Sequence, residues 1–477
     1  MGRQRRRGNE RKLPYLCGMQ KLLPSIPTIL SYLKIDALNE MQQAALEAGQ
    51  QANDLILLAD TGSGKTLGFL LPVLQLLDPS NPTTQALVIV PSRELALQIE
   101  QVFRQMSTGL KVTCCYGGHL RETEENNLLQ APALIIGTPG RLADHLRRQN
   151  IKVDGIATLM LDEFDKSLEL GFEEEMSFII GSLPFLTKRI LTSATDAVTL
   201  PSFIGLNEPV TLNYLSGTVN AALAIQVVHS EEKDKVDTLF RLICYLGNRS
   251  AIIFCNHRES VERTSTLLSD KGIINVFYHG AMEQPERDRA LCKFRNGTSN
   301  VLVTTDLAAR GLDIPNIRYI IHFHLPNTEE VFIHRNGRTA RMDASGTAIL
   351  ILGPEEKLPG YVTGNSGQQG PGRMGGAAEK PGQAVEEIVL PETSVLPEKP
   401  KWSTLLVSAG KKDKVNKVDI VGFLTNKGQL KKEDIGLIEV KDFFSFVAVR
   451  KSRVGNTLQL IKNERIKNKK VKIDMAK

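Results

Sequence analysis

Two series of short apolar runs constrain the fold of this chain more than any other feature of its sequence. The first series, between residues 40 and 215, comprises Leu55–Leu58, Ala86–Val90, Leu134–Ile136, Leu159–Leu161 and Ile190–Leu191. The second, between residues 225 and 352, comprises Ala251–Phe254, Val276–Tyr278, Val301–Thr304, Tyr319–Ile321 and Ala348–Leu352. Such runs, separated by longer amphipathic stretches, are typical of parallel strands that helices bury on both faces. The sequence therefore predicts two α/β lobes in tandem.

A glycine-rich segment directly follows the first run. Glycines free backbone N–H groups to converge on a phosphate at a helix N-terminus, where Lys65 adds positive charge and Thr66 offers a hydroxyl to Mg²⁺. Ala59 stands where the general pattern has glycine, so a flexible turn is the alternative. The segment predicts a nucleoside triphosphate site. Its predicted contacts are Ala59, Asp60, Thr61, Gly62, Ser63, Gly64, Lys65 and Thr66.

An acidic cluster follows the run that ends at Leu161. Asp162, at a strand end facing the phosphate loop, is suited to hold Mg²⁺ together with Thr66. Glu163 is a candidate catalytic residue that orients or deprotonates the attacking water. Considered without the phosphate loop, such a cluster is more often a helix N-cap.

A basic cluster in the second series is suited to the same phosphate chemistry. Phosphoryl transfer builds charge on the γ-phosphate, and guanidinium groups that reach across a cleft stabilise it. Arg338 and Arg341 lie three residues apart, on one helical face, and His334 precedes them. All three are predicted catalytic residues; a surface ion-pair network is the alternative.

Charge is unevenly distributed along the 477 residues. Residues 401–477 carry 19 Lys and Arg against 8 Asp and Glu, whereas the other 400 residues carry 40 against 45. A basic tail favours a nucleic-acid partner, with a solvated lysine-rich surface as the alternative.

The sequence contains no apolar run of about 18 residues, so we expect no membrane association. Six cysteines without metal-ligand spacing indicate reduced thiols and a cytoplasmic protein.

Composition also marks the domain boundaries. We expect a basic disordered leader over residues 1–18, with Met19 as a second possible start, and a Gly- and Pro-rich flexible linker over residues 358–400. The predicted folded units are an ATP-binding lobe over residues 19–215, a second lobe over residues 216–357 and an RNA-binding domain over residues 401–477.

The ordered motifs of residues 22–355 resemble those of the DEAD-box RNA helicases. The resemblance implies two RecA-like lobes, ATP and Mg²⁺ as cofactors, and RNA as the partner. Gln42 looks like the adenine-reading glutamine, and Gly311 and Asp313 resemble further nucleotide contacts. Asp165 and Ser193-Ala194-Thr195 resemble the residues that couple ATP to RNA. The implied RNA-backbone contacts are Pro91, Arg93, Gly117, Gly118, Thr138, Pro139, Gly140, Arg141, Asn256, Gln284, Arg287, Thr305, Asp306 and Arg310.

The resemblance implies an RNA-dependent ATPase that opens short RNA duplexes. Phe164 stands where the family has alanine, next to both acids, so the coupling of hydrolysis to strand opening is in question. This departure supports a rival interpretation, an ATP-gated RNA clamp or assembly scaffold that does not unwind. A DNA helicase is a weaker third interpretation.

The tail has the strand and helix order βαββαβ, which predicts an RRM-like α+β domain. Phe444 and Phe446 share one face of its third strand and are either base-stacking or core residues. The tail also resembles the C-terminal domain of DbpA-type helicases, which binds large-subunit ribosomal RNA. That likeness implies a monomeric protein acting on pre-ribosomal particles in ribosome assembly. The predicted RNA contacts are Lys411, Lys412, Lys414, Arg450, Lys451 and Arg453.

Overall fold

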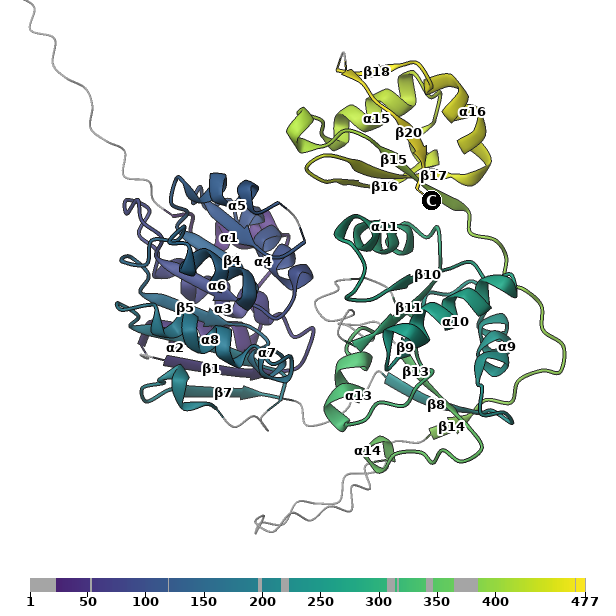
Figure 1. Cartoon of the computed structure of the whole chain (residues 1–477), viewed down its shortest axis with the longest axis horizontal. Helices are drawn as coiled ribbons and strands as arrows, with labels where there is room; N and C mark the ends of the chain where they lie inside the picture. Colours follow the sequence, from purple (N-terminus) through teal and green to yellow (C-terminus); the bar gives the residue numbers. More distant parts are fainter. Residues whose placement is uncertain are drawn as a thin grey trace, which may run out of the picture.

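The computed structural model forms two α/β lobes and a C-terminal α+β domain, drawn in Figure 1 from purple to yellow. It describes residues 23–51, 54–118, 120–195, 200–215, 223–306, 314, 317–339, 346–363, 385–467 and 469–476. The predicted leader lies outside these residues. Within them, no helix has both the length and the apolar character needed to cross a membrane.

The described residues of the first lobe form a parallel sheet of seven strands in the order β3-β4-β2-β5-β6-β1-β7. The strands are β1 (Asp54–Ala59), β2 (Ala86–Ile89), β3 (Val112–Cys115), β4 (Leu134–Gly137), β5 (Thr158–Leu161), β6 (Lys188–Ser193) and β7 (Val210–Tyr214). Five of these were predicted. The prediction missed β3, whose sequence Val-Thr-Cys-Cys contains a polar residue, and β7, an edge strand without a buried residue.

Helices cover both faces of this first sheet. They are α1 (Ile26–Leu33), α2 (Glu40–Gln51), α3 (Lys65–Gln75), α4 (Arg93–Gln105), α5 (Arg121–Leu128), α6 (Pro139–Arg147), α7 (Phe164–Glu169) and α8 (Glu173–Gly181). Alternate strand residues enter two separate cores: Leu55 packs with α3 and α4, whereas Ile56 packs with α6 and α8. Burial on both faces explains why the central strands read as continuous apolar runs.

The second lobe repeats this architecture in its described residues. Its sheet has the order β10-β11-β9-β12-β13-β8-β14. The strands are β8 (Leu223–His229), β9 (Ala251–Cys255), β10 (Asn275–Tyr278), β11 (Val301–Thr305), β12 (Tyr319–His322), β13 (Gly346–Leu352) and β14 (Val385–Glu387). The helices are α9 (Val236–Leu246), α10 (Arg258–Asp270), α11 (Gln284–Arg295), α13 (Glu329–Asn336) and α14 (Gly360–Thr363).

Part of the predicted linker belongs to this second lobe. Strand β14 pairs in parallel with β8 at the edge of the sheet, and Ile388 beyond it is buried in the lobe's core. The Arg241 guanidinium then donates to the Pro391 carbonyl at 2.9 Å. Composition concealed this strand because Val385-Glu386-Glu387 carries one apolar residue and takes its position from backbone pairing. Residues 364–384, where glycine is densest, lie outside the described residues.

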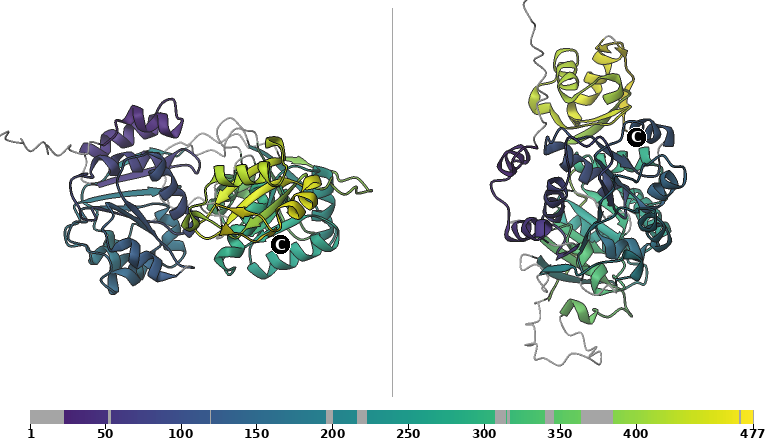
Figure 2. Two further views of the ribbon diagram at one scale, coloured as in Figure 1. Left: turned by 90° about the horizontal axis from the view of Figure 1, so that it is seen from above. Right: turned by 90° about the vertical axis from the view of Figure 1, so that its left-hand side faces the viewer.

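The C-terminal domain confirms the predicted RRM-like order. Its sheet is antiparallel, in the order β16-β17-β15-β20, with a small hairpin, β18–β19, before the last strand. The elements are β15 (Trp402–Val407), α15 (Lys417–Asn426), β16 (Ile435–Val440), β17 (Ser445–Arg450), α16 (Lys451–Ile461), β18 (Arg465–Ile466), β19 (Lys469–Lys470) and β20 (Ile473–Met475). Figure 2 shows this domain over the second lobe.

Candidate active site and RNA interface

The order of strands divides the candidate residues of the first lobe into two groups. The phosphate loop, the acids and Ser193 follow or end β1, β5 and β6, which are neighbours in the sheet. The predicted RNA motifs follow β2, β3 and β4, which are neighbours on the other side. Since carboxyl ends of parallel strands meet at one edge, the predicted nucleotide contacts (the nucleotide half) and the predicted RNA contacts (the RNA half) lie side by side there.

The phosphate loop joins β1 to α3. Gly62 and Gly64 have φ angles of 88° and 90°, in the left-handed region that glycine adopts without strain. The Lys65 ammonium donates to the Ala59 carbonyl inside the loop. Burial lowers the pKa of Lys65, although the carboxylates of Asp162 and Glu163 oppose this effect. The loop is thus folded around a half-buried cation, as suits phosphate binding.

Gln42 lies directly against this loop. Its side-chain amide donates to the Gly64 carbonyl at 3.2 Å, and a Cβ on Gly64 would stand 2.5 Å from the Gln42 nitrogen. Asn39 holds the other side of Gln42: its backbone N–H donates to the Gln42 side-chain oxygen at 3.1 Å. The structure therefore brings the predicted adenine-reading residue to the nucleotide half of the edge.

The acids after β5 form a largely buried group, in which Lys166 Nζ lies 3.8 Å from Asp165 Oδ2. Asp162 accepts hydrogen bonds from the Thr192 hydroxyl and from the Glu163 N–H, the latter at 3.0 Å. Burial, with the neighbouring Glu163, raises the pKa of Asp162 to about 6. Glu163 has a φ of 47°, rare for a residue with a side chain and often found at functional sites. Glu163 Oε2 and both oxygens of Asp165 are buried without a hydrogen-bond partner.

The second lobe closes over this nucleotide half. His334 Nε2 lies 3.9 Å from Asp165 Oδ2, and a Cβ on Gly337 would stand 3.1 Å from the Cβ of Thr61 in the phosphate loop. Arg338, which follows, is buried. His334 and Gly337 of the basic cluster thus meet the acids and the loop of the first lobe.

Arg335, which the sequence analysis did not single out, organises the second lobe's side of the site. Its guanidinium is 2% exposed and bonds Asp306 through two nitrogens. It also donates to Asn256 Oδ1 at 2.8 Å and to the His324 carbonyl at 2.7 Å. Two predicted RNA contacts, Asn256 and Asp306, are therefore tied to the helix that carries His334. A buried arginine in a basic cluster has no distinguishing sequence signal.

The side chain of Phe164 is buried in the core of the first lobe. Its ring is 2% exposed and lies in the core cluster that contains Leu161, Met176 and Ile179. As the first residue of α7, Phe164 fills the space between the sheet and α8. Its position next to the acids in sequence therefore does not place the ring in the cleft.

The predicted RNA contacts of the second lobe also meet those of the first. Arg287 of α11 pairs with Glu94 of α4 at 2.7 Å, and both side chains are buried. Arg93 donates to Gln284 Oε1 at 3.2 Å. The Arg93 guanidinium passes over Gly118, whose φ is 95° and where a Cβ would clash at 2.2 Å. These contacts bring Arg93, Gln284 and Arg287 together across the lobes.

Other predicted residues lie where their motifs place them. The Ser193 hydroxyl donates to the Thr195 carbonyl at 2.7 Å, a tight turn after β6 that contains the buried Ala194. Pro91 follows β2, and Thr138 is the N-cap of α6, which begins with Pro139 and Gly140. Thr305 ends β11. Arg310, Gly311, Asp313 and Arg341 lie outside the described residues.

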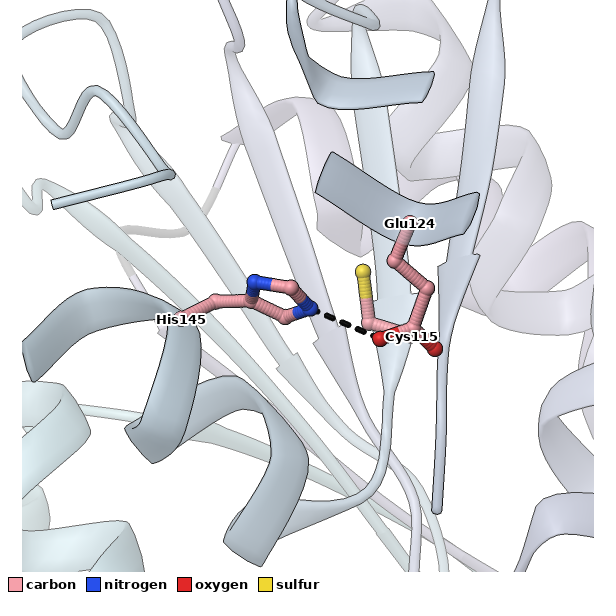
Figure 3. Close-up of side chains that lie close together, drawn as sticks. All are labelled: Cys115, Glu124 and His145. Carbon is pink, nitrogen blue, oxygen red and sulfur yellow. Dashed lines mark hydrogen bonds and ion pairs between the residues drawn. The ribbon is translucent and has the colours of Figure 1, made fainter. Parts of the chain in front are cut away.

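The buried carboxylate of Glu124 links two of the predicted RNA motifs, the glycine pair and the segment that contains Arg141. Its carboxylate accepts from the Tyr116 N–H, before the glycine pair, at 2.7 Å, and lies 3.3 Å from Arg141 Nε. It also contacts His145 Nε2 at 2.7 Å, beside the Cys115 thiol (Figure 3). Cys115, Glu124 and His145 have the composition of a metal site. However, the carboxylate already binds these partners, a guanidinium lies beside it, and burial raises the pKa of Cys115. We assign the cluster to hydrogen bonding.

Replacing Glu124 with alanine should destabilise this part of the first lobe. The change leaves the Tyr116 N–H, Arg141 and His145 without their shared acceptor. We expect a loss of about 3–5 kcal/mol, as for breaking a buried ion pair. Glu124→Gln keeps an acceptor and should cost about 1–3 kcal/mol. Urea-dependent hydrogen exchange of the β4 amides measures both losses; equal protection in the wild type and Glu124→Ala would contradict this assignment.

The C-terminal domain places its sheet face on α11. Phe446, 1% exposed, packs with Cys292 of α11 and Ala476, and Phe444 lies edge-on to it at 5.3 Å. At the margin, the Thr404 hydroxyl lies 2.7 Å from that of Thr298. The face that carries the two phenylalanines is therefore an interdomain contact here, in which Phe446 is packed and Phe444 is partly buried.

The predicted cations of the tail fall into two groups. Lys411, Lys412 and Lys414 follow the end of β15, whereas Arg450, Lys451 and Arg453 stand at the opposite end of β17. The hairpin β18–β19 joins the first group: Lys467 donates to the Lys414 carbonyl at 2.8 Å, and Lys469 pairs with Asp413. Sequence analysis missed these hairpin lysines, whose excess of positive charge was the available signal.

Comparison with known families agrees with the division of the chain into two lobes and a C-terminal domain. A DEAD/DEAH box helicase model matches residues 39–200, a helicase conserved C-terminal domain model residues 234–343, and a DbpA RNA binding domain model residues 404–475. The chain is 32% identical to the ATP-dependent RNA helicase DbpA of Escherichia coli over 461 residues, covering 96% of this chain and 98% of that protein. This chain is a DEAD-box RNA helicase.

Further relatives support the same assignment of the helicase. It is 30% identical to the ATP-dependent RNA helicase DbpA of Bacillus subtilis, over 92% of this chain and 94% of that protein. Among solved structures, S. cerevisiae Dbp5 bound to RNA and ADP BeF3 aligns with a TM-score of 0.62 and 28% identity, covering 69% of this chain and 87% of that one. The DEAD-box helicase Mss116 bound to ssRNA and UDP-BeF aligns with a TM-score of 0.61 and 26% identity, covering 69% and 72%. The helicase is therefore an ATP-dependent, RNA-binding enzyme of the DbpA type.

Proposed function

We propose that this helicase opens short RNA duplexes during assembly of the large ribosomal subunit, with its C-terminal domain selecting a ribosomal RNA site. The observation that carries this proposal is the docking of a DbpA-type domain on α11, the helix that also contributes Gln284 and Arg287 to the inter-lobe contacts. Site selection by the tail and strand opening by the core would then act next to each other. The proposed protein is a cytoplasmic monomer that acts on pre-ribosomal particles.

In the proposed mechanism, the closed lobes hydrolyse ATP. Glu163 orients or deprotonates the attacking water, while Arg338 and Arg341 stabilise charge on the γ-phosphate. Asp165, in contact with His334, and the turn at Ser193-Ala194-Thr195 link the nucleotide to the RNA half.

Thr66 and Asp162 are the residues that would hold Mg²⁺. The raised pKa of Asp162 and the buried carboxylate oxygens of Glu163 and Asp165 without hydrogen-bond partners indicate a local excess of negative charge. A dication fits such a site. When bound, Mg²⁺ would neutralise the phosphate oxygens.

RNA would bind across both RNA halves through its backbone. Gly117 and Gly118 permit close approach, Thr138–Arg141 form a helix N-terminus, and Arg93 adds charge. Such contacts read phosphates, so binding by the core should be independent of base sequence and sensitive to salt. Release would follow hydrolysis.

The two rival functions now have less support. An RNA clamp without unwinding rested on Phe164 beside the acids, and that ring lies in the core. A DNA helicase accords poorly with a DbpA RNA binding domain. An unwinding assay on a short RNA duplex separates the helicase from the clamp, and competition with matched DNA addresses the third candidate.

The test of the proposed function compares ATP hydrolysis alone, with generic RNA, and with large-subunit ribosomal RNA fragments that carry the DbpA-type hairpin, with Lys65→Ala as the blank. We expect hairpin fragments to stimulate at much lower concentrations than generic RNA. Lys411→Ala/Lys412→Ala should raise the required hairpin concentration about tenfold, through two lost phosphate contacts, and leave the maximal rate unchanged. Equal stimulation by every RNA would remove the ribosomal targeting.

A matched control comes from the same domain. Lys427→Ala/Lys431→Ala also removes two exposed lysines, but away from the loop of residues 411–414. The hairpin response should then stay close to that of the wild type. A loss as large as that in Lys411→Ala/Lys412→Ala would mean that net charge, and not the loop, attracts the RNA.

A further inference from the structure

A chain of polar contacts links the C-terminal domain to the inter-lobe contacts of the core. Arg93 of the first lobe donates to Gln284 Oε1 at 3.2 Å, and the Gln284 amide nitrogen faces Asp288 Oδ1 at 3.5 Å. The same oxygen lies 3.4 Å from the ammonium of Lys441, in the turn between β16 and β17. Three domains therefore meet through two residues of α11, one helical turn apart.

Lys441 is well placed to neutralise Asp288. The side chains are 30% and 18% exposed, so water screens the pair only in part. Burial disfavours the ammonium charge, but Asp288 and Glu439 together hold the pKa of Lys441 above its usual value. Without this cation, the Asp288 carboxylate would lose its ion-pair partner in the C-terminal domain and would add negative charge next to Gln284 and Arg287, where RNA phosphates are proposed to bind.

The backbone holds Lys441 in this place. Its carbonyl accepts from the Lys411 N–H at 2.8 Å, and a Cβ on Gly410 would clash with that carbonyl at 2.3 Å. The turn that carries Lys441 is therefore fixed to the basic loop of residues 411–414. Movement of that loop on RNA binding would reach Asp288 through one side chain.

We propose that Lys441 is a positioning residue: it neutralises Asp288, which orients the Gln284 amide toward Arg93, so that docking of the tail prepares the core to close on RNA. This inference rests on the proposed role of Arg93 and Gln284 as RNA contacts. It assigns to the tail a second role, besides site selection.

The chain provides a matched control for this proposal. Arg295 crosses the same interface, 3.3 Å from Glu439, but stands two helical turns beyond Asp288. Both Lys441→Met and Arg295→Met remove one interdomain cation and keep much of the aliphatic stem. Trp402, the single tryptophan of the chain, lies beside Gly297 at the same interface, so its fluorescence reports whether the domain stays docked.

The experiment measures ATP hydrolysis of the full chain against generic single-stranded RNA, which leaves tail selectivity aside. In Lys441→Met, we expect the RNA concentration for half-maximal stimulation to rise about three- to tenfold, with the maximal rate and Trp402 fluorescence unchanged. Arg295→Met should resemble the wild type. Asp288→Asn combined with Lys441→Met should restore most of the response, because it removes the uncompensated charge.

Two results would overturn the proposal. Equal effects of Lys441→Met and Arg295→Met, with shifted Trp402 fluorescence, would show that docking alone matters. An unchanged RNA response in Lys441→Met would show that the contacts from Lys441 through Asp288 to Gln284 do not affect RNA binding. Hydrogen exchange of the Glu286, Arg287 and Asp288 amides gives a readout independent of ATP, and faster exchange is expected in Lys441→Met only. If the wild type shows no RNA-stimulated hydrolysis, the proposed function fails, and this exchange result still decides the role of Lys441.

Discussion

Glu163→Gln should reduce RNA-stimulated ATP hydrolysis by about 10²–10⁴-fold, the usual contribution of a general base. Glutamine has nearly the same size and preserves the N-cap position of Glu163 before α7. It cannot accept a proton from water, so the chemical step is lost while the loop that binds ATP stays intact. Because release is proposed to follow hydrolysis, RNA should also dissociate more slowly in the presence of ATP. Steady-state hydrolysis and RNA dissociation kinetics measure the two effects.

The control for this prediction is Glu173→Gln. Glu173 is an exposed acid at the start of α8 in the same lobe, so its loss should leave the rate unchanged. A Glu163→Gln rate within a few-fold of the wild type would reject Glu163 as the base and direct attention to Asp165, whose buried carboxylate oxygens also have no hydrogen-bond partner.

Phe164→Ala should destabilise the first lobe by about 3–5 kcal/mol, the range for deleting a buried ring. The cavity would open between the sheet and α8, where Leu161, Met176 and Ile179 surround the ring. Since the ring is buried in the hydrophobic core, hydrolysis and unwinding per folded molecule should change little. Urea-dependent hydrogen exchange of the β5 amides measures the stability, and single-turnover assays on the folded fraction measure activity.

Phe185 is the matched control for Phe164. It lies in the same lobe and is 58% exposed, so Phe185→Ala should stay within about 0.5 kcal/mol of the wild type. If Phe164→Ala instead left stability unchanged and altered unwinding alone, the ring would act on the nucleotide site, and the RNA clamp would again be a serious candidate.

Sequence analysis predicted those strands whose sequences carry their own signal. The central strands are apolar on both faces, and the phosphate loop and the acids follow directly after such strands. By contrast, β7 is an exposed edge strand, and β14 gains its place from pairing with β8. Neither strand requires an apolar run, so the sequence analysis predicted neither of them.

The candidate site divides in the same way. Lys65, Asp162 and Glu163 were identified from local motifs, since strand ends gather such residues at one edge. Glu124 and Arg335 act through several partners distant in sequence, and no local pattern marks them. The direction of the Phe164 ring depends on the space between the sheet and α8, which only packing reveals.

Strand β14 determines how far the C-terminal domain is able to move. The glycine-rich residues 364–384 lie in sequence between α14 and β14, both of which belong to the second lobe, so lengthening this segment would not lengthen the tether of the tail. The true tether begins after Leu396, which packs on Gly272, and ends at Lys401, a span of about 17 Å when fully extended. An undocked tail therefore stays at a high effective concentration beside α11, and travelling further would require stripping an edge strand from the sheet.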